Sequence, residues 1–126
     1  MRKRNSTNYE NQKKLEASCG LTYAMILLSG RWKVNILWNI NNGINRYGML
    51  KNGIPGISEK MLTQRLKDLE NEGLIIRKDF QKIPPHVEYY LTDAGKLLTP
   101  ILGRLCSWGS KVRPMMMELE NQPITE

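Results

Sequence analysis

Four side chains between residues 58 and 72 have the chemistry needed to read the edges of DNA bases. Helical spacing places them on one face, and they are Lys60, Thr63, Gln64 and Lys67. A glutamine can pair with adenine at N6 and N7, a lysine can bond guanine at O6 and N7, and a threonine methyl can contact a thymine methyl. Arg65 lies at the edge of this face and could reach the sugar-phosphate backbone. The alternative is an ordinary solvated face, because Lys and Gln are also good helix formers.

The segment that carries this face is predicted to be a helix from Ser58 to Glu72. Ser58 is a candidate N-cap, and Ile57 before it can pack on Leu62 as a hydrophobic staple. The Ser58 hydroxyl and the free amides of the first turn suit a phosphate oxygen. Gly73 supplies the left-handed residue that ends such a helix. The stripe expected to face the core consists of Leu62, Leu66 and Leu69.

Apolar spacing on either side predicts the elements that would position this helix. Helices are expected over residues 21–28, 34–41 and 46–52, and strands over residues 74–80 and 87–91. Arg46, at the start of the third of these helices, is a further candidate DNA contact. Thr92 can cap a final helix, which Pro100 should kink or interrupt. The expected fold is therefore mainly α with one small β-hairpin (α+β), a winged helix-turn-helix in which the hairpin is the wing.

The predicted hairpin adds positive charge next to the candidate reading face. Lys78 lies on its first strand, Lys82 lies near its tip, and His86 lies beside that tip. A stiff cationic loop could lie along the sugar-phosphate backbone or probe the minor groove, and a solvated surface hairpin is the alternative. The chain has a net charge of +7, and residues 21–56 hold four cations and no anion, which suits a surface facing phosphate.

The chain has 126 residues, which is enough for one compact domain. Residues 1–16 are expected to be a basic flexible arm, residues 17–113 a winged helix-turn-helix domain with dimerisation helices, and residues 114–126 an acidic tail. No apolar run approaches the roughly 18 residues that a membrane span needs. Two distant cysteines favour a reducing compartment. We therefore expect a cytoplasmic protein with no membrane partner.

Four segments, in this order and spacing, resemble the HxlR-type transcriptional regulators, relatives of the MarR winged-helix group. They lie between Cys19 and about Trp108 and read LSGRWKVNILWNI, RYGMLKNGIPGISEKMLTQRLKDLENEGLIIRKDF, PPHVEYYLTDAGKLL and LCSWG. The resemblance implies a homodimer that binds an inverted repeat in double-stranded DNA, with residues 58–72 as recognition helix and residues 77–91 as wing. It also implies that the first and last helices form the dimer interface.

The final helix has more apolar positions than a small core needs. Leu98 and Leu102 fall outside the stripe formed by Leu97, Ile101, Leu105 and Trp108. A partner subunit would explain both sets, and a deeper core is the alternative. The candidate interface residues are Leu21, Met25, Leu98, Leu102, Leu105 and Trp108.

Cys19 lies immediately before the first predicted helix, where the helix dipole and free amides favour a thiolate. Some members of the resembled family sense oxidants or electrophiles through a cysteine at this place, which makes Cys19 a candidate redox sensor. That family usually has proline after this cysteine, whereas this chain has Gly20, and a buried structural thiol is the alternative. Cys106, on an apolar helix, is expected in the core.

Neither catalysis nor a metal site is expected. Two cysteines and His86 are too few soft ligands for a four-coordinate zinc ion. Gly48 and Gly53 have the spacing of a phosphate loop without its Lys-Ser/Thr pair. No cofactor is expected, and no residue argues for a small-molecule effector. A dimeric, sequence-specific DNA-binding transcription regulator is therefore favoured over a winged-helix module that binds a protein or RNA.

Overall fold

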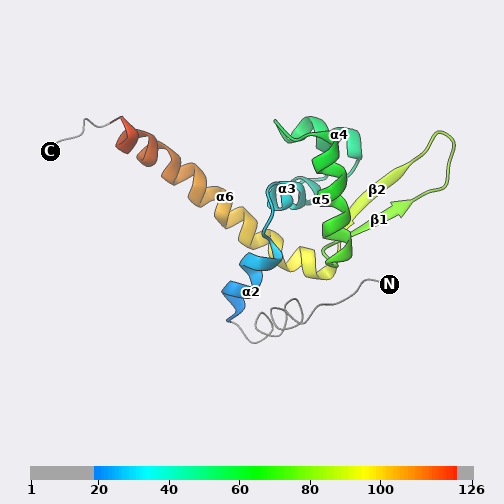
Figure 1. Ribbon diagram of the computed structural model, residues 1–126, viewed down its shortest axis with the longest axis horizontal. Helices are drawn as coiled ribbons and strands as arrows, with labels where there is room; N and C mark the ends of the chain where they lie inside the picture. The colour runs from blue at the N-terminus through cyan, green and yellow to red at the C-terminus, as the bar shows by residue number, and fades with distance from the viewer. Residues whose placement is uncertain (1–18, 122–126) are drawn as a thin grey trace, which may run out of the picture.

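The computed structural model describes residues 19–121, so the arm expected over residues 1–16 lies outside the described residues. In chain order the elements are α2 (Gly20–Leu27), α3 (Lys33–Asn41), α4 (Tyr47–Gly53), α5 (Glu59–Asn71), β1 (Ile75–Asp79), β2 (Val87–Leu91) and α6 (Asp93–Glu120). The fold is mainly helical with one small β-hairpin, as the sequence predicts. Figure 1 shows α3, α4 and α5 gathered beside the base of the hairpin, with α6 extending away from them.

The core forms where the apolar stripes of the helices meet the inner side of the hairpin. Helices α3 and α5 each supply three of its residues, and α4, the loop after α4, the residue before β1, β1, β2 and α6 supply the rest. Burial of these aliphatic side chains is the main driving force for the fold. The core residues are Ile36, Leu37, Ile40, Leu50, Ile54, Ile57, Leu62, Leu66, Leu69, Leu74, Ile75, Tyr89 and Leu102.

The local signals that predict α5 are all present in the structure. The Ser58 hydroxyl accepts a hydrogen bond from the Met61 amide at 3.1 Å, which caps the helix. Ile57 and Leu62 are both buried, consistent with the expected staple. Gly73 has φ +77° and ends the helix, and the Leu74 amide donates to the carbonyl oxygen of Leu69 at 3.0 Å. This six-to-one bond is the pattern of a Schellman stop, so the predicted start and end of α5 are confirmed.

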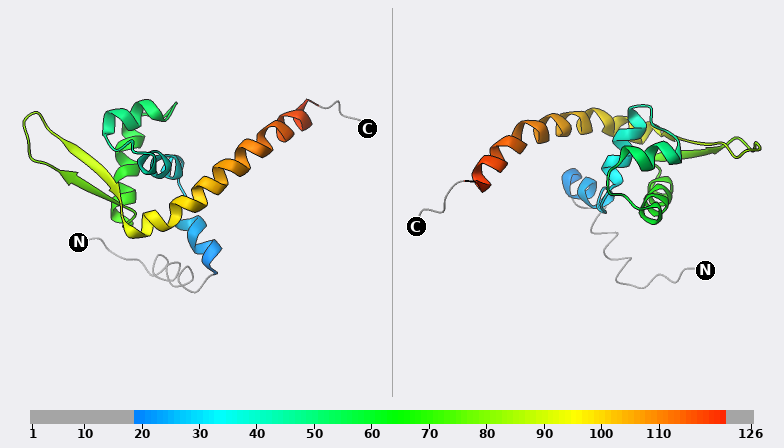
Figure 2. Two further views of the ribbon diagram at one scale, coloured as in Figure 1. Left: turned by 180° about the vertical axis from the view of Figure 1, so that it is seen from behind. Right: turned by 90° about the horizontal axis from the view of Figure 1, so that it is seen from above.

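The two strands pair antiparallel, with Ile75 opposite Leu91 and Asp79 opposite Val87. The free edge of β2 is not left open at its centre. The Tyr89 amide donates to the carbonyl oxygen of Asn45 at 2.9 Å, so the segment that precedes α4 holds the base of the hairpin. The outer half of the hairpin extends beyond the helices, as both views in Figure 2 show.

Helix α6 runs for 28 residues and contains both Pro100 and Pro114. The Thr92 hydroxyl caps it by accepting from the Gly95 amide at 3.2 Å, as predicted. Pro100 does not interrupt the helix, and the right-hand view of Figure 2 shows a gently curved rod instead. A proline removes one backbone hydrogen bond, and the flanking turns retain theirs. Residues 114–120 therefore continue α6 and do not begin a separate tail.

The side of α6 that faces the core differs from the expected one. Leu102 is only 6% exposed and Leu98 is partly buried, because both pack inside this chain. Leu102 is therefore a core residue of this chain and not an exposed interface residue, whereas the interface role of the partly exposed Leu98 stays a prediction. The line that stays exposed consists of Leu97, Ile101, Leu105 and Trp108. Cys106 is exposed as well, which contradicts its expected place in the core.

Candidate nucleic-acid interface

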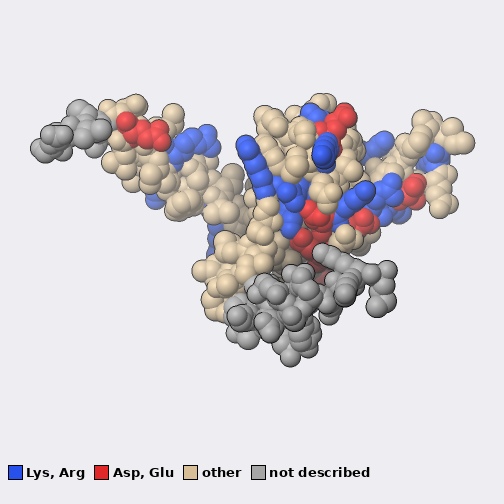
Figure 3. All heavy atoms as spheres, viewed as in Figure 1, with Lys and Arg blue, Asp and Glu red and all other residues tan. Residues whose placement is uncertain are grey.

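The face of α5 that was predicted to read DNA is uncovered. Ser58, Lys60, Thr63, Gln64 and Lys67 are all exposed, while the leucine stripe on the opposite side is buried. Figure 3 shows Lys and Arg side chains over α5 and along the hairpin, with acidic side chains among them. The rest of the described chain therefore leaves this side of α5 open to a large partner.

Asp68 accepts hydrogen bonds from two of the residues predicted to contact DNA, Gln64 and Arg65. The Gln64 side-chain amide donates to Asp68 Oδ1 at 2.9 Å, and Arg65 Nη1 donates to Asp68 Oδ2 at 2.8 Å. The hydrogen bond from Gln64 is the main cause that holds the pKa of the Asp68 carboxyl below its usual range. The hydrogen bond and the charge of Arg65 act in the same direction, and partial burial opposes them. The Gln64 amide would have to leave Asp68 before it could bond any other partner. The Arg65 guanidinium lies close to Gly30 and is partly buried.

Tyr47 is a residue of this surface that the sequence reasoning missed. Its hydroxyl donates to the carbonyl oxygen of Glu59 at 3.0 Å and lies 3.1 Å from the Thr63 hydroxyl. It therefore ties α4 to the first turn of α5. The only available signal was an aromatic residue at the start of a short helix, which is equally typical of core packing.

A cleft of about 440 Å³ separates α5 from the base of the hairpin. Its two basic lining residues, Lys67 and Arg77, come from α5 and β1 respectively. Helix α5 and the hairpin therefore line the same cleft, with a cation on each side of it. The full lining is Tyr47, Thr63, Leu66, Lys67, Glu70, Arg77 and Tyr89.

The outer part of the hairpin carries the predicted cations. Lys78 Nζ and Lys82 Nζ lie 4.8 and 5.7 Å from the centre of the Phe80 ring, and both lysines are exposed. Ile83 at the tip is fully exposed. Lys78 and Lys82 are therefore available to a phosphate backbone, as the sequence predicts.

Arg46, at the N-cap of α4, and His86, next to the outer end of β2, lie together and are partly buried. Arg46 Nη1 is 3.3 Å from His86 Nδ1, and the other imidazole nitrogen is bonded to Glu88. The sequence places His86 beside the tip of the hairpin, and it gives no sign of this contact with Arg46. Hydrogen bonds from Tyr90, His86 and Asn45 hold the pKa of the Glu88 carboxyl below its usual range.

Comparison with known proteins identifies the family of this chain. The family described as HxlR-like helix-turn-helix matches residues 27–117, which is most of the chain. The chain belongs to this family. A relative named HTH-type transcriptional regulator YkvN, from Bacillus subtilis, is 45% identical over 92 residues, covering 73% of this chain and 78% of the relative.

Two solved structures of regulators are also similar to this chain. The redox regulator HypR in its reduced form is 29% identical, with a TM-score of 0.73, and the match covers 79% of this chain and 99% of HypR. Reduced YodB from B. subtilis is 32% identical, with a TM-score of 0.63, covering 75% of this chain and 93% of YodB. The HxlR-like protein described here is therefore a transcriptional regulator with a winged helix-turn-helix fold.

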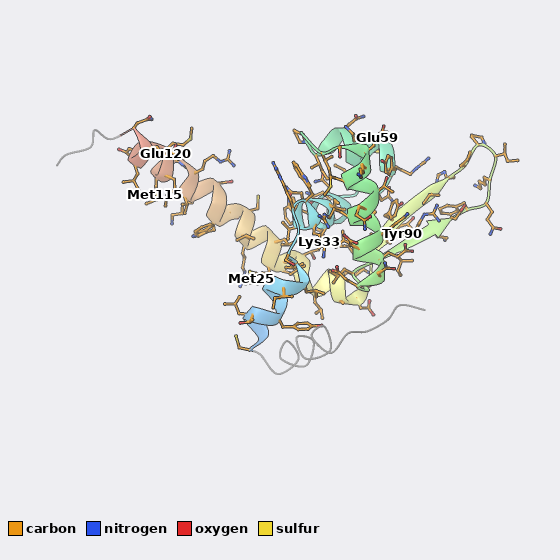
Figure 4. The ribbon with its side chains drawn as sticks, in the orientation of Figure 1. Met25, Lys33, Glu59, Tyr90, Met115 and Glu120 are labelled. Atoms are coloured by element: carbon orange, nitrogen blue, oxygen red, sulfur yellow. The ribbon has the colours of Figure 1, made fainter. Side chains whose placement is uncertain are left out.

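Lys33 of this HxlR-like protein lies in the basic stretch of the sequence but is not part of the exposed polar face of α5. It is 5% exposed, and its Nζ donates to Glu72 and, at 3.2 Å, to the carbonyl oxygen of Leu27. Figure 4 shows Lys33 among the helices, close to the end of α2. Lys33 therefore connects the end of α2 with the C-cap of the recognition helix. Sequence reasoning missed this role, because an isolated lysine gives no sign of a partner 39 residues away.

Cys19 is exposed at the N-cap of α2, so the buried-thiol alternative is wrong. Its Sγ lies 3.3 Å from the Thr22 hydroxyl. The hydrogen bond from that hydroxyl, followed by the bonds from the Thr22 and Leu21 amides, lowers the pKa of the thiol. The direction agrees with the thiolate-favouring position that the sequence predicts.

None of the helices within residues 19–121 has the length and apolar character that a membrane span requires. No three His, Cys, Asp or Glu side chains within this range gather as a metal-binding group.

Proposed function

We propose that this regulator is a homodimer that binds an inverted repeat in double-stranded DNA in the cytoplasm. In this proposal α5 enters the major groove and the hairpin lies on the sugar-phosphate backbone or in the minor groove. The observation that carries it is the uncovered polar face of α5, which is continuous with the cations of the wing across one cleft. Ser58 and the first-turn amides of α5 receive a phosphate, and Arg46 contributes from the start of α4.

The dimer is supported by apolar surface that one chain leaves uncovered. Helices α2 and α6 expose Leu21, Met25, Leu97, Ile101, Leu105 and Trp108. A contiguous apolar patch of this kind is unusual on a monomer, and a second copy would bury it. A two-fold axis through these helices would place two recognition helices about 34–36 Å apart, one turn of DNA.

The experiment that tests the function is selection of bound duplexes from a random pool, read by sequencing. We expect a palindromic motif, because a two-fold dimer presents the same reading face twice. Failure to enrich any motif would favour the alternative function, a winged-helix module that binds a protein or RNA without operator specificity.

Two substitutions should separate backbone contacts from base contacts. Lys82→Ala should reduce the slope of log affinity against log salt by about one unit, with unchanged base preference, because one phosphate contact is lost. Gln64→Ala should leave that slope unchanged and relax preference at one base position, at a cost of about 1–3 kcal/mol. Binding titrations at several salt concentrations, on the selected site and its single-base variants, measure both effects.

Lys111→Ala is the matched control, because Lys111 lies on α6 away from the hairpin. Its slope and base preference should equal those of the unmodified protein. The assignment of α5 and the wing would be wrong if Lys82→Ala and Gln64→Ala bound every duplex as the unmodified protein does.

We also propose that oxidants or electrophiles act on this regulator through Cys19. The supporting observations are its exposed, thiolate-favouring position and the similarity to HypR, which is named a redox regulator, and to YodB, which is known in a diamide-treated form. A thiolate is the reactive form of cysteine.

Treatment with diamide or a quinone should change operator affinity in the native protein and leave Cys19→Ser unaffected. Thr22→Val should slow the reaction at a given pH, because loss of the hydroxyl hydrogen bond raises the pKa of the thiol. Gel-shift titration after timed treatment measures both effects, with Cys106→Ser as the control that should behave as native protein. An equal response in native protein and Cys19→Ser would eliminate Cys19 as the sensor.

A further inference from the structure

The outer half of β2 is joined to the start of α4 by a network of side chains. Glu88 on β2 accepts hydrogen bonds from Asn45 Nδ2 at 3.2 Å, from His86 Nε2 and from the Tyr90 hydroxyl. His86 Nδ1 lies 3.3 Å from Arg46 Nη1. The network therefore spans two segments about 40 residues apart in the chain, next to the backbone bond between Tyr89 and Asn45.

The partners of His86 determine which of its nitrogens carries the proton. A guanidinium has donors only, so Arg46 donates and His86 Nδ1 must accept. An ionised carboxylate accepts only, so His86 Nε2 must carry the hydrogen that it donates to Glu88. Glu88 is ionised near neutral pH, because its three donors hold its pKa below the usual range. In this arrangement His86 accepts from Arg46 at Nδ1 and donates to Glu88 from Nε2.

Packing fixes the plane of the ring. The Phe80 ring meets the imidazole edge-on, with 4.7 Å between ring centres and an angle of 88° between planes. The Phe80 amide also donates to the carbonyl oxygen of His86 at 2.9 Å, which closes the outer end of the hairpin. The cations Lys78 and Lys82 lie over the Phe80 ring, so the orientation of His86 is coupled to the part of the wing that faces DNA.

We propose that His86 is a positioning residue for DNA binding, which holds Arg46 and the wing at a fixed angle to α4 and does not itself contact DNA. This inference rests on the proposed function. Arg46 uses one of five guanidinium donors on His86, which leaves others for a backbone phosphate. A fixed wing also lowers the entropy that must be lost when Lys78 and Lys82 are ordered on DNA.

The first test needs no DNA and therefore stands apart from the proposed function. Long-range proton–nitrogen NMR spectra of the imidazole should show an unprotonated Nδ1 and a protonated Nε2 at neutral pH. Backbone relaxation should show ordered amides at Lys82 and Ile83 that become more mobile in His86→Phe, which keeps an aromatic ring but has no hydrogen bond. A proton on Nδ1, or unchanged mobility in His86→Phe, would overturn the proposal even if operator binding is established.

The second test measures affinity for the selected duplex in three variants that keep different parts of the histidine. Asn places an amide oxygen near the position of Nδ1 and can still accept from Arg46. Gln places an amide nitrogen near the position of Nε2 and can still donate to Glu88. We expect His86→Phe and His86→Gln to weaken binding by about three- to tenfold, as for loss of one or two hydrogen bonds, with His86→Asn closest to native protein.

The salt dependence then separates positioning from direct contact. His86→Asn should keep the native slope of log affinity against log salt, because it still accepts from Arg46 and His86 itself neutralises no phosphate. A loss of about one unit of slope in His86→Asn would show that His86 contacts the backbone directly and would overturn the proposal. If the native protein selects no duplex, the proposed function fails while the NMR result still decides the connection between His86 and Arg46.

Discussion

Replacing Gly95 by alanine should lower the free energy of unfolding by about 3 kcal/mol, as in severe overpacking. A Cβ atom at this position would lie 2.4 Å from the carbonyl oxygen of Leu74 and 3.2 Å from a methyl carbon of Leu91. The Leu74 carbonyl cannot easily retreat, because it also accepts a hydrogen bond from the Thr92 amide at 3.1 Å. The first turn of α6 would therefore be forced away from the junction of α5 and the hairpin.

Urea unfolding followed by circular dichroism, at one fixed protein concentration, measures this effect. Gly48→Ala is the matched control, because a Cβ there meets nothing within 4 Å. Gly48 lies in α4, so alanine should raise stability by about 0.5–1 kcal/mol through backbone entropy. Equal stability changes in the two variants would contradict the close contact between α6 and Leu74.

Lys33→Met should destabilise the protein by about 2–3 kcal/mol, somewhat less than is usual for breaking a fully buried ion pair. The side chain of Lys33 is 7% exposed and that of Glu72 is 24% exposed, so water compensates the remaining carboxylate only in part. The substitution also removes the donor to the Leu27 carbonyl, which links α2 to the rest of the fold. The methionine retains most of the apolar stem, so the loss reports the charge and its hydrogen bonds.

A second substitution tests the cause of that loss. Glu72→Gln in the Lys33→Met background should recover part of the stability, because no uncompensated charge remains at the C-cap of α5. Denaturant unfolding of the two single variants and the double variant gives the coupling between the residues. Additive effects would show that Lys33 and Glu72 act independently, contrary to the observed contact.

The elements of this fold could be predicted from sequence because their signals are local. Ser58, the leucine stripe and Gly73 lie within one segment, and together they specify where α5 begins, which side is apolar and where it ends. The hairpin is similar, since β-branched and aromatic runs flank a proline-containing loop. The polar side of α5 follows directly, because the period of the helix places Lys60 and Gln64 opposite the leucines.

The partners of individual side chains could not be predicted in this way. Lys33 meets Glu72 and Arg46 meets His86 across 39 and 40 residues of chain, and a local pattern carries no information about such distant pairs. The same limit explains why the role of Tyr47 was missed. The residue types predicted for this surface are present, but Arg46 and His86 contact each other.

Local sequence alone determined the leucine stripe and the ends of α5 and the cationic surface of α5 and the wing. Only tertiary structure decided which apolar side of α6 faces this chain, since the buried Leu102, the partly buried Leu98 and the exposed Leu97 and Leu105 are equally apolar. The choice depends on how α6 crosses α3, where Trp38 lies against Gly103. Helical periodicity defines the faces of a helix, but the direction from which the core approaches is set by the packing of distant elements.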